Sequence, residues 1–143
     1  MVVVDDQLLL ALLSGTAPRV LVDELTTGQV FTTGSWYYRL GRAVASGSDS
    51  GALSGRFSVL PESSRRSVRQ ALDDLPAQFG LLSLRTLVPV MQVIRVSRPL
   101  NFLNAEGIAA AVLLDARIAV STESALLSLA CRELHIGFDL MDV

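Results

Sequence analysis

The sequence predicts an α/β domain, a three-layer α/β/α sandwich with a mainly parallel central sheet. Short apolar runs that are typical of buried strands alternate along the chain with amphipathic segments that are typical of helices. The runs at residues 1–4 and 117–120 are mostly apolar without alternation, which indicates strands covered on both faces. A chain of 143 residues is large enough for one core. We therefore expect residues 1–143 to form a single domain.

The first half of the chain opens with a strand and continues with helices separated by turn residues. Pro18 precedes a short helix, and a cluster of hydroxyl side chains ends the second strand and caps the helix after it. The Ser- and Gly-rich stretch 46–55 is expected to be a mobile loop. The expected elements of this half are a strand at 1–4, helices at 8–13 and 19–25, a strand at 29–31, and helices at 36–45 and 61–75.

The second half repeats the alternation of strands and helices. Pro89 is expected in the first turn of a helix, where its missing N–H does little harm. An alanine-rich stretch is expected to be helical because alanine has the highest helix propensity. The expected elements of this half are strands at 81–84, 117–120 and 136–140, and helices at 86–96, 104–115 and 123–134.

Composition narrows the classes of function. Half of the residues are apolar (50%) and the mean hydropathy is +0.46, yet no apolar stretch approaches the roughly 20 residues of a membrane-spanning helix. The start lacks the basic region and cleavage site of a signal peptide, so we expect a cytoplasmic protein with no membrane segment. The net charge of −2 gives no overall attraction to nucleic acid, so contact with RNA would need a local arginine patch.

Carboxylates follow two of the expected strands directly. Asp5 comes after the strand at 1–4, and Glu123 follows the strand at 117–120. The carboxyl ends of parallel strands meet at one edge of the sheet, where ligands bind in open α/β folds. Glu106, near the start of the alanine-rich helix, would lie at the same edge. A cluster of acids without His or Cys favours Mg²⁺ or Mn²⁺, and such ions activate water for phosphodiester cleavage.

At these positions the chain resembles a PIN domain, the nuclease fold of VapC-type toxins and of several RNA-processing enzymes. Residues 3–5 are similar to the opening strand of the family and its first catalytic Asp. Residues 105–111 resemble its alanine-rich helix, with Glu106 in place of the usual Asp. Residues 120–123 resemble its late strand ending in Thr-x-Asp, again with Glu for Asp, and residues 130–136 look like its final helix. The resemblance spans nearly the whole chain.

The resemblance implies a Mg²⁺- or Mn²⁺-dependent endoribonuclease, such as the toxin of a toxin–antitoxin pair, with an antitoxin as its protein partner and a homodimer as its assembly. Asp5, Glu106 and Glu123 would be catalytic and would hold the metal, with Asp6 as a further ligand. Arginine side chains would position the RNA. The candidates lie on two expected helices and are Arg39, Arg42, Arg65 and Arg69.

One departure from the family pattern supports an alternative. The family carries a Glu on the helix after its second strand, and here Ser35 or a neighbour occupies that place without an acid. Asp6 or Glu62 would have to supply the missing oxygen. The alternative is a catalytically inactive PIN-like module that serves dimerisation or protein binding. A third class, a small-ligand or receiver-like α/β domain, suits Asp5, but a receiver needs a lysine and the chain has none.

Several of these residues also have structural explanations. Asp5 and Asp6 suit a strand end followed by a helix N-cap, where short acids satisfy free N–H groups. The aromatic stretch 36–38 could stack bases, but such clusters more often belong to a core or an interface. His135 near a helix end and Cys131 inside a helix are expected to be structural.

Overall fold

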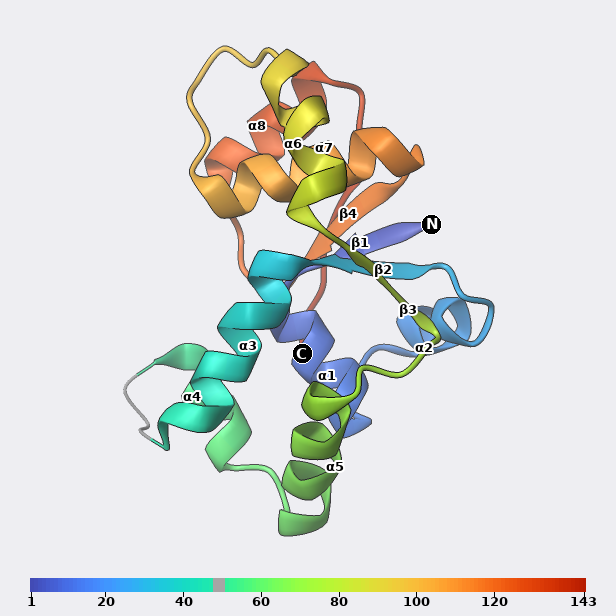
Figure 1. The fold of residues 1–143 in the computed structure, drawn as a ribbon, viewed down its shortest axis with the longest axis vertical. Helices are drawn as coiled ribbons and strands as arrows, with labels where there is room; N and C mark the ends of the chain where they lie inside the picture. Colours follow the sequence, from blue (N-terminus) through green and yellow to red (C-terminus); the bar gives the residue numbers. More distant parts are fainter. Residues whose placement is uncertain (48–50) are drawn as a thin grey trace.

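The computed structural model describes residues 1–47 and 51–143 and confirms the α/β/α sandwich. Its central sheet has five strands in the order β3-β2-β1-β4-β5, and every pairing is parallel. Figure 1 shows the sheet crossing the middle of the molecule, with helices above and below it. The strands are β1 (Val2–Val4), β2 (Val30–Thr33), β3 (Phe79–Leu82), β4 (Arg117–Val120) and β5 (Phe138–Leu140).

The central strand β1 separates two hydrophobic cores. Side chains alternate between the faces of a strand, so Val2 and Val4 pack into one core and Val3 into the other. All three valines are fully buried. This double burial explains why the run carries no polar residue before Asp5.

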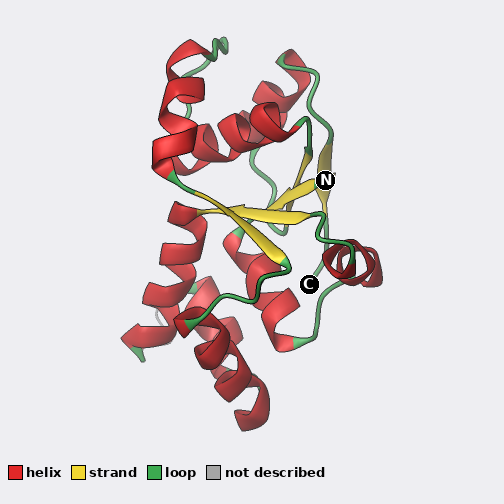
Figure 2. Ribbon diagram, turned by 45° about the vertical axis from the view of Figure 1, so that its right-hand side comes forward, coloured by secondary structure: helices red, strands yellow, loops and turns green. Residues whose placement is uncertain are grey.

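Helices cover both faces of the sheet (Figure 2). The core that contains Val2 and Val4 also receives side chains from α1 to α5. The core that contains Val3 receives side chains mainly from α6, α7 and α8. The helices are α1 (Asp6–Ser14), α2 (Arg19–Thr26), α3 (Gly34–Ser46), α4 (Ala52–Ser58), α5 (Glu62–Asp73), α6 (Leu84–Val93), α7 (Phe102–Leu114) and α8 (Ala125–Glu133).

Two expectations for local structure were wrong. The stretch 46–55 was expected to be a loop, but α4 begins at Ala52, because Leu53 and Phe57 lie one helical turn apart and both insert into the core. Residues 48–50 of that stretch lie outside the described residues. Pro89 lies in the interior of α6 and not in its first turn. It is exposed there, so water can solvate the carbonyl that its missing N–H leaves free.

The helix α3 starts immediately at the end of β2 and approaches α7 closely. Thr33 caps it by accepting a hydrogen bond from the Trp36 N–H at 3.4 Å. The Trp36 indole is 3% exposed and packs against Gly107 of α7, where an added Cβ would lie 2.5 Å from the ring. The absence of a side chain at Gly107 therefore lets α3 and α7 meet.

Within the described residues, no helix has both the length and the apolar character needed to cross a membrane. Cys131 is buried in α8, as expected for a structural cysteine, and burial raises the pKa of its thiol to about 11.

Candidate active site

A cavity of about 320 Å³ opens at the carboxyl ends of β1 and β4. We call it the acidic cavity. Three of the four predicted metal ligands line it, namely Asp5, Asp6 and Glu123, and Arg39 of α3 lies on its wall. The structure therefore brings the two strand-end acids to one place.

Asp5 connects the end of β1 to the loop after β4. Its Oδ1 accepts a hydrogen bond from the Leu8 N–H at 2.8 Å and so caps α1. Its Oδ2 accepts one from the Ser121 N–H at 2.9 Å. The residue is 7% exposed, and burial raises the pKa of its carboxyl although these hydrogen bonds oppose the rise. Asp5 thus fulfils the structural role of an N-cap while it also lines the cavity.

The carboxylate of Asp6 accepts fewer hydrogen bonds than that of its neighbour Asp5. Its Oδ2 is buried, accepts no hydrogen bond from a described residue, and lies 3.3 Å from Nη1 of Arg39. Burial raises the pKa of the Asp6 carboxyl to about 6; the Arg39 guanidinium opposes this rise and the Asp5 carboxylate adds to it. A buried carboxylate with so few partners is a favourable position for a cation.

Glu123 also lines the cavity, from the segment after β4. It lies in the turn before α8 and not in the helix, which begins at Ala125. The N-cap of α8 is Ser124, whose Oγ accepts a hydrogen bond from the Leu127 N–H at 3.3 Å. Glu123 is exposed and takes part in no ion pair within the described part of the chain. Its carboxylate is therefore free to turn toward a ligand.

Glu106, the fourth predicted ligand, is not among the residues that line the cavity. It is completely buried, and its Oε1 accepts a hydrogen bond from the Ser35 N–H at 3.4 Å. Its Oε2 has no hydrogen-bond partner among the described residues. The carboxylate thus meets the positive end of the α3 dipole. Ser35 or a neighbour is the position at which the resemblance to PIN domains implies an acid, and Glu106 of α7 reaches the backbone N–H of Ser35.

The carboxylate oxygens of the acidic cavity suit a hard cation that takes only a few of its ligands from the protein. No group of three or more His, Cys, Asp or Glu residues in 1–47 and 51–143 is placed to hold a metal ion. Mg²⁺ usually keeps several waters and takes one or two carboxylates together with substrate phosphates. The Oδ2 of Asp6, which accepts no hydrogen bond from a described residue and lies beside Asp5, fits that smaller requirement.

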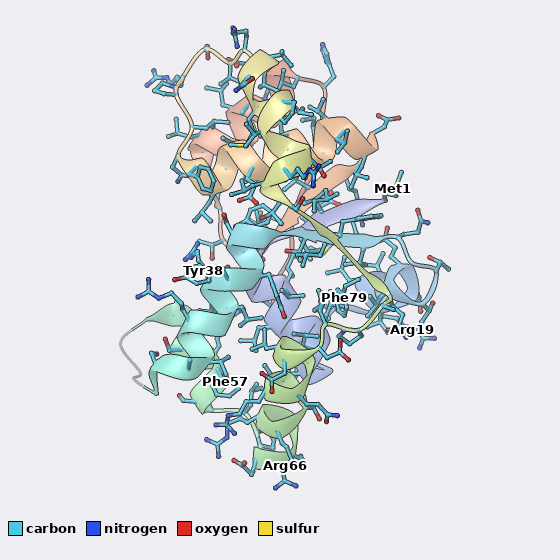
Figure 3. All side chains as sticks on the ribbon, viewed as in Figure 1. Met1, Arg19, Tyr38, Phe57, Arg66 and Phe79 are labelled. Atoms are coloured by element: carbon cyan, nitrogen blue, oxygen red, sulfur yellow. The ribbon has the colours of Figure 1, made fainter. Side chains whose placement is uncertain are left out.

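The four predicted RNA-binding arginines separate into two groups. Arg39 and Arg42 lie on α3 beside the acidic cavity. Arg65 and Arg69 lie on α5 and do not line the acidic cavity; both pair with Glu62, at 2.7 and 3.6 Å. In Figure 3 the label of Arg66 marks α5 at the lower end of the molecule. Glu62, proposed as a substitute acid, is likewise absent from the acidic cavity.

The three residues of the aromatic stretch 36–38 differ in exposure. Trp36 belongs to the core, and Tyr37 is partly buried and donates a hydrogen bond from its hydroxyl to the Leu72 carbonyl of α5. Tyr38 is 64% exposed and projects from α3 in Figure 3. Only Tyr38 of the three offers an accessible ring.

Sequence reasoning missed several polar residues of the site, among them Asn101, Asn104 and Ser121. Asn104 lines the acidic cavity, held by Asn101, which caps α7 by accepting a hydrogen bond from the Asn104 N–H at 2.8 Å. Ser121 fixes the Asp5 carboxylate. The sequence does contain a signal for Asn101 and Asn104. An Asn directly after Pro99-Leu100 and before the alanine-rich helix is a recognisable N-cap.

Comparison of the chain with models of protein families gave no match, and neither did comparison with curated proteins. The resemblance to PIN domains therefore depends on the motifs quoted above.

Proposed function

We propose that the chain is a PIN-like, Mg²⁺- or Mn²⁺-dependent endoribonuclease that cleaves RNA phosphodiester bonds in the acidic cavity. One observation carries this proposal: Asp5, Asp6 and Glu123 line a single cavity at the carboxyl ends of β1 and β4, with an arginine on its wall. Only oxygen ligands gather there, and a parallel sheet presents its reactive groups at this edge.

The roles of the residues follow from their places. Asp5 and Asp6 would hold the ion, and Glu123 would reach it from the turn before α8. Held by these carboxylates, a divalent cation would activate a water and polarise the phosphate. Arg39, already 3.3 Å from Asp6, can donate to a phosphate oxygen at the same place. Glu106 would hold the start of α3 in place by accepting its hydrogen bond from the backbone there.

The biological setting comes from the resemblance alone. A VapC-type toxin is a cytoplasmic homodimer that its antitoxin holds inactive. We propose the same setting for this chain.

Titration with Mn²⁺ or Mg²⁺ by calorimetry, with RNA cleavage assayed on the same samples, tests the proposal. Asp5→Asn removes a charge but keeps an N-cap acceptor, and Glu123→Gln alters an exposed residue, so both variants should fold. Asp23→Asn is the control, since Asp23 is an exposed acid on α2. We expect saturable binding and cleavage that Asp5→Asn abolishes, Glu123→Gln weakens and the control retains.

A second candidate is the catalytically inactive PIN-like module that serves dimerisation or protein binding. The specific observation in its favour is Glu106, which is completely buried and turned toward Ser35 and not toward the cavity. Folded wild-type protein that neither binds the cation nor cleaves RNA would select this candidate over the nuclease.

A further inference from the structure

A second cavity lies next to the acidic one, between α1, α3 and the start of α4. Its volume is about 480 Å³, and it is lined on α3 by Tyr38, Arg39, Arg42 and Ser46, with Ser54 on the α4 side. We call it the arginine pocket. None of the described residues that line it is acidic. Its size is in the range of a nucleotide and larger than a single phosphate needs.

The two cavities are neighbours. Gln7 and Arg39 line both of them, so a ligand that passes these two side chains can extend from the acids to the arginines. Arg39 is half-exposed (51%) and lies between the Asp6 carboxylate and the pocket. A chain molecule with regularly spaced phosphates fits this alternation of acid and base, because one phosphate can meet the cation while the next meets the guanidinium groups.

Two further features favour a nucleic acid strand. Arg42 is exposed, and it forms no ion pair with a described residue. Tyr38, at 64% exposure, presents an aromatic ring at the rim of the pocket. Aromatic faces beside a basic groove are the usual means of holding single-stranded bases.

We propose that the arginine pocket holds the nucleotide next to the scissile phosphate of a single-stranded RNA, with Arg39 and Arg42 on its phosphate and Tyr38 stacked on its base. This inference deepens the proposed nuclease function and rests on it for the choice of RNA. Arg42 and Tyr38 are binding residues here, since neither lines the acidic cavity.

The test measures binding of a short fluorescein-labelled single-stranded RNA by anisotropy in EDTA, where cleavage and cation binding play no part. Arg42→Gln should weaken binding about tenfold, and it should reduce the slope of log K against log salt by about 0.7, the loss of one phosphate contact. Tyr38→Ala should weaken binding at least about fivefold, whereas Tyr38→Phe, which keeps the ring, should not.

Arg66→Gln is the matched control. Arg66 is an exposed arginine on α5, outside the pocket, and its loss changes the net charge by the same amount. Wild-type affinity in this control, with weakened binding in Arg42→Gln, supports the pocket. Equal weakening by the two arginine changes, or no RNA binding by the wild type, would overturn it.

The failure of this inference can be told apart from the failure of the nuclease proposal. RNA binding in EDTA that depends on Arg42 and Tyr38 supports the pocket even if Asp5 binds no cation. Cation-dependent cleavage in a protein whose RNA affinity ignores Arg42 and Tyr38 would leave the nuclease standing and remove the pocket.

Discussion

Replacement of Asp6 by Asn should make the protein more stable at neutral pH. The Asp6 side chain is 7% exposed, and its pKa is raised from 3.8 to about 6, chiefly by burial. The folded chain therefore binds this proton more tightly than the unfolded chain does. The stabilisation that results is fully present below pH 3.8 and is lost as the pH rises through about 6.

The magnitude follows from the size of the shift. A rise in pKa from 3.8 to about 6 corresponds to about 3 kcal/mol at a pH above both values. This net shift already includes the opposing attraction of Arg39 and of the backbone N–H groups at the start of α1, so an Asn at the same place avoids the whole cost. We expect Asp6→Asn to raise the free energy of unfolding by about 3 kcal/mol at pH 7.5.

Urea unfolding in EDTA, followed by circular dichroism at a series of pH values, measures this effect. The wild type should lose stability between pH 4 and 6.5, and Asp6→Asn should lose less over the same interval. Asp23→Asn, at an exposed acid, should follow the wild type. A variant that is less stable than wild type at pH 7.5, with an unchanged pH profile, would refute the reasoning.

Three further predictions concern packing, capping and reactivity. Gly107→Ala should lower the free energy of unfolding by about 1–3 kcal/mol, because the new Cβ would lie 2.5 Å from Trp36. Gly55→Ala is the control: it has open space around it and should leave stability unchanged or raise it. Equal urea midpoints for the two variants would contradict this reasoning. Asp5→Ala should be about 1 kcal/mol less stable than Asp5→Asn, since only Asn keeps an acceptor for the helix cap, and the comparison of their urea midpoints decides it. Cys131 should resist a thiol reagent in the folded protein and react after unfolding, because it is buried and its thiol pKa is about 11; rapid labelling of native protein would show otherwise.

Sequence patterns located the sheet and the strand-end acids because these depend on local order. A buried apolar run followed by Asp5 can be read directly, and parallel pairing then brings Asp5 and Glu123 to one edge. The direction of the Glu106 side chain could not be read in this way. It depends on where α7 meets α3, which is set by contact between Gly107 and Trp36, residues that are distant in the sequence.

The error at α4 arose because composition outweighed spacing. The Ser and Gly residues of 46–55 obscured the one-turn spacing of Leu53 and Phe57, which forms α4. The same spacing explains an ion pair on α5, where Glu62 lies one turn before Arg65.

The position of Trp36 also gives the chain an intrinsic optical reporter. Trp36 is the single tryptophan in the sequence, it lines the acidic cavity, and it packs against the residue that follows Glu106. Indole emission responds to nearby charge and to water, so a cation or a strand entering the cavity should change the fluorescence of the unlabelled protein. Every variant that keeps Trp36 can thus be followed by the same signal, without attaching a dye to the protein.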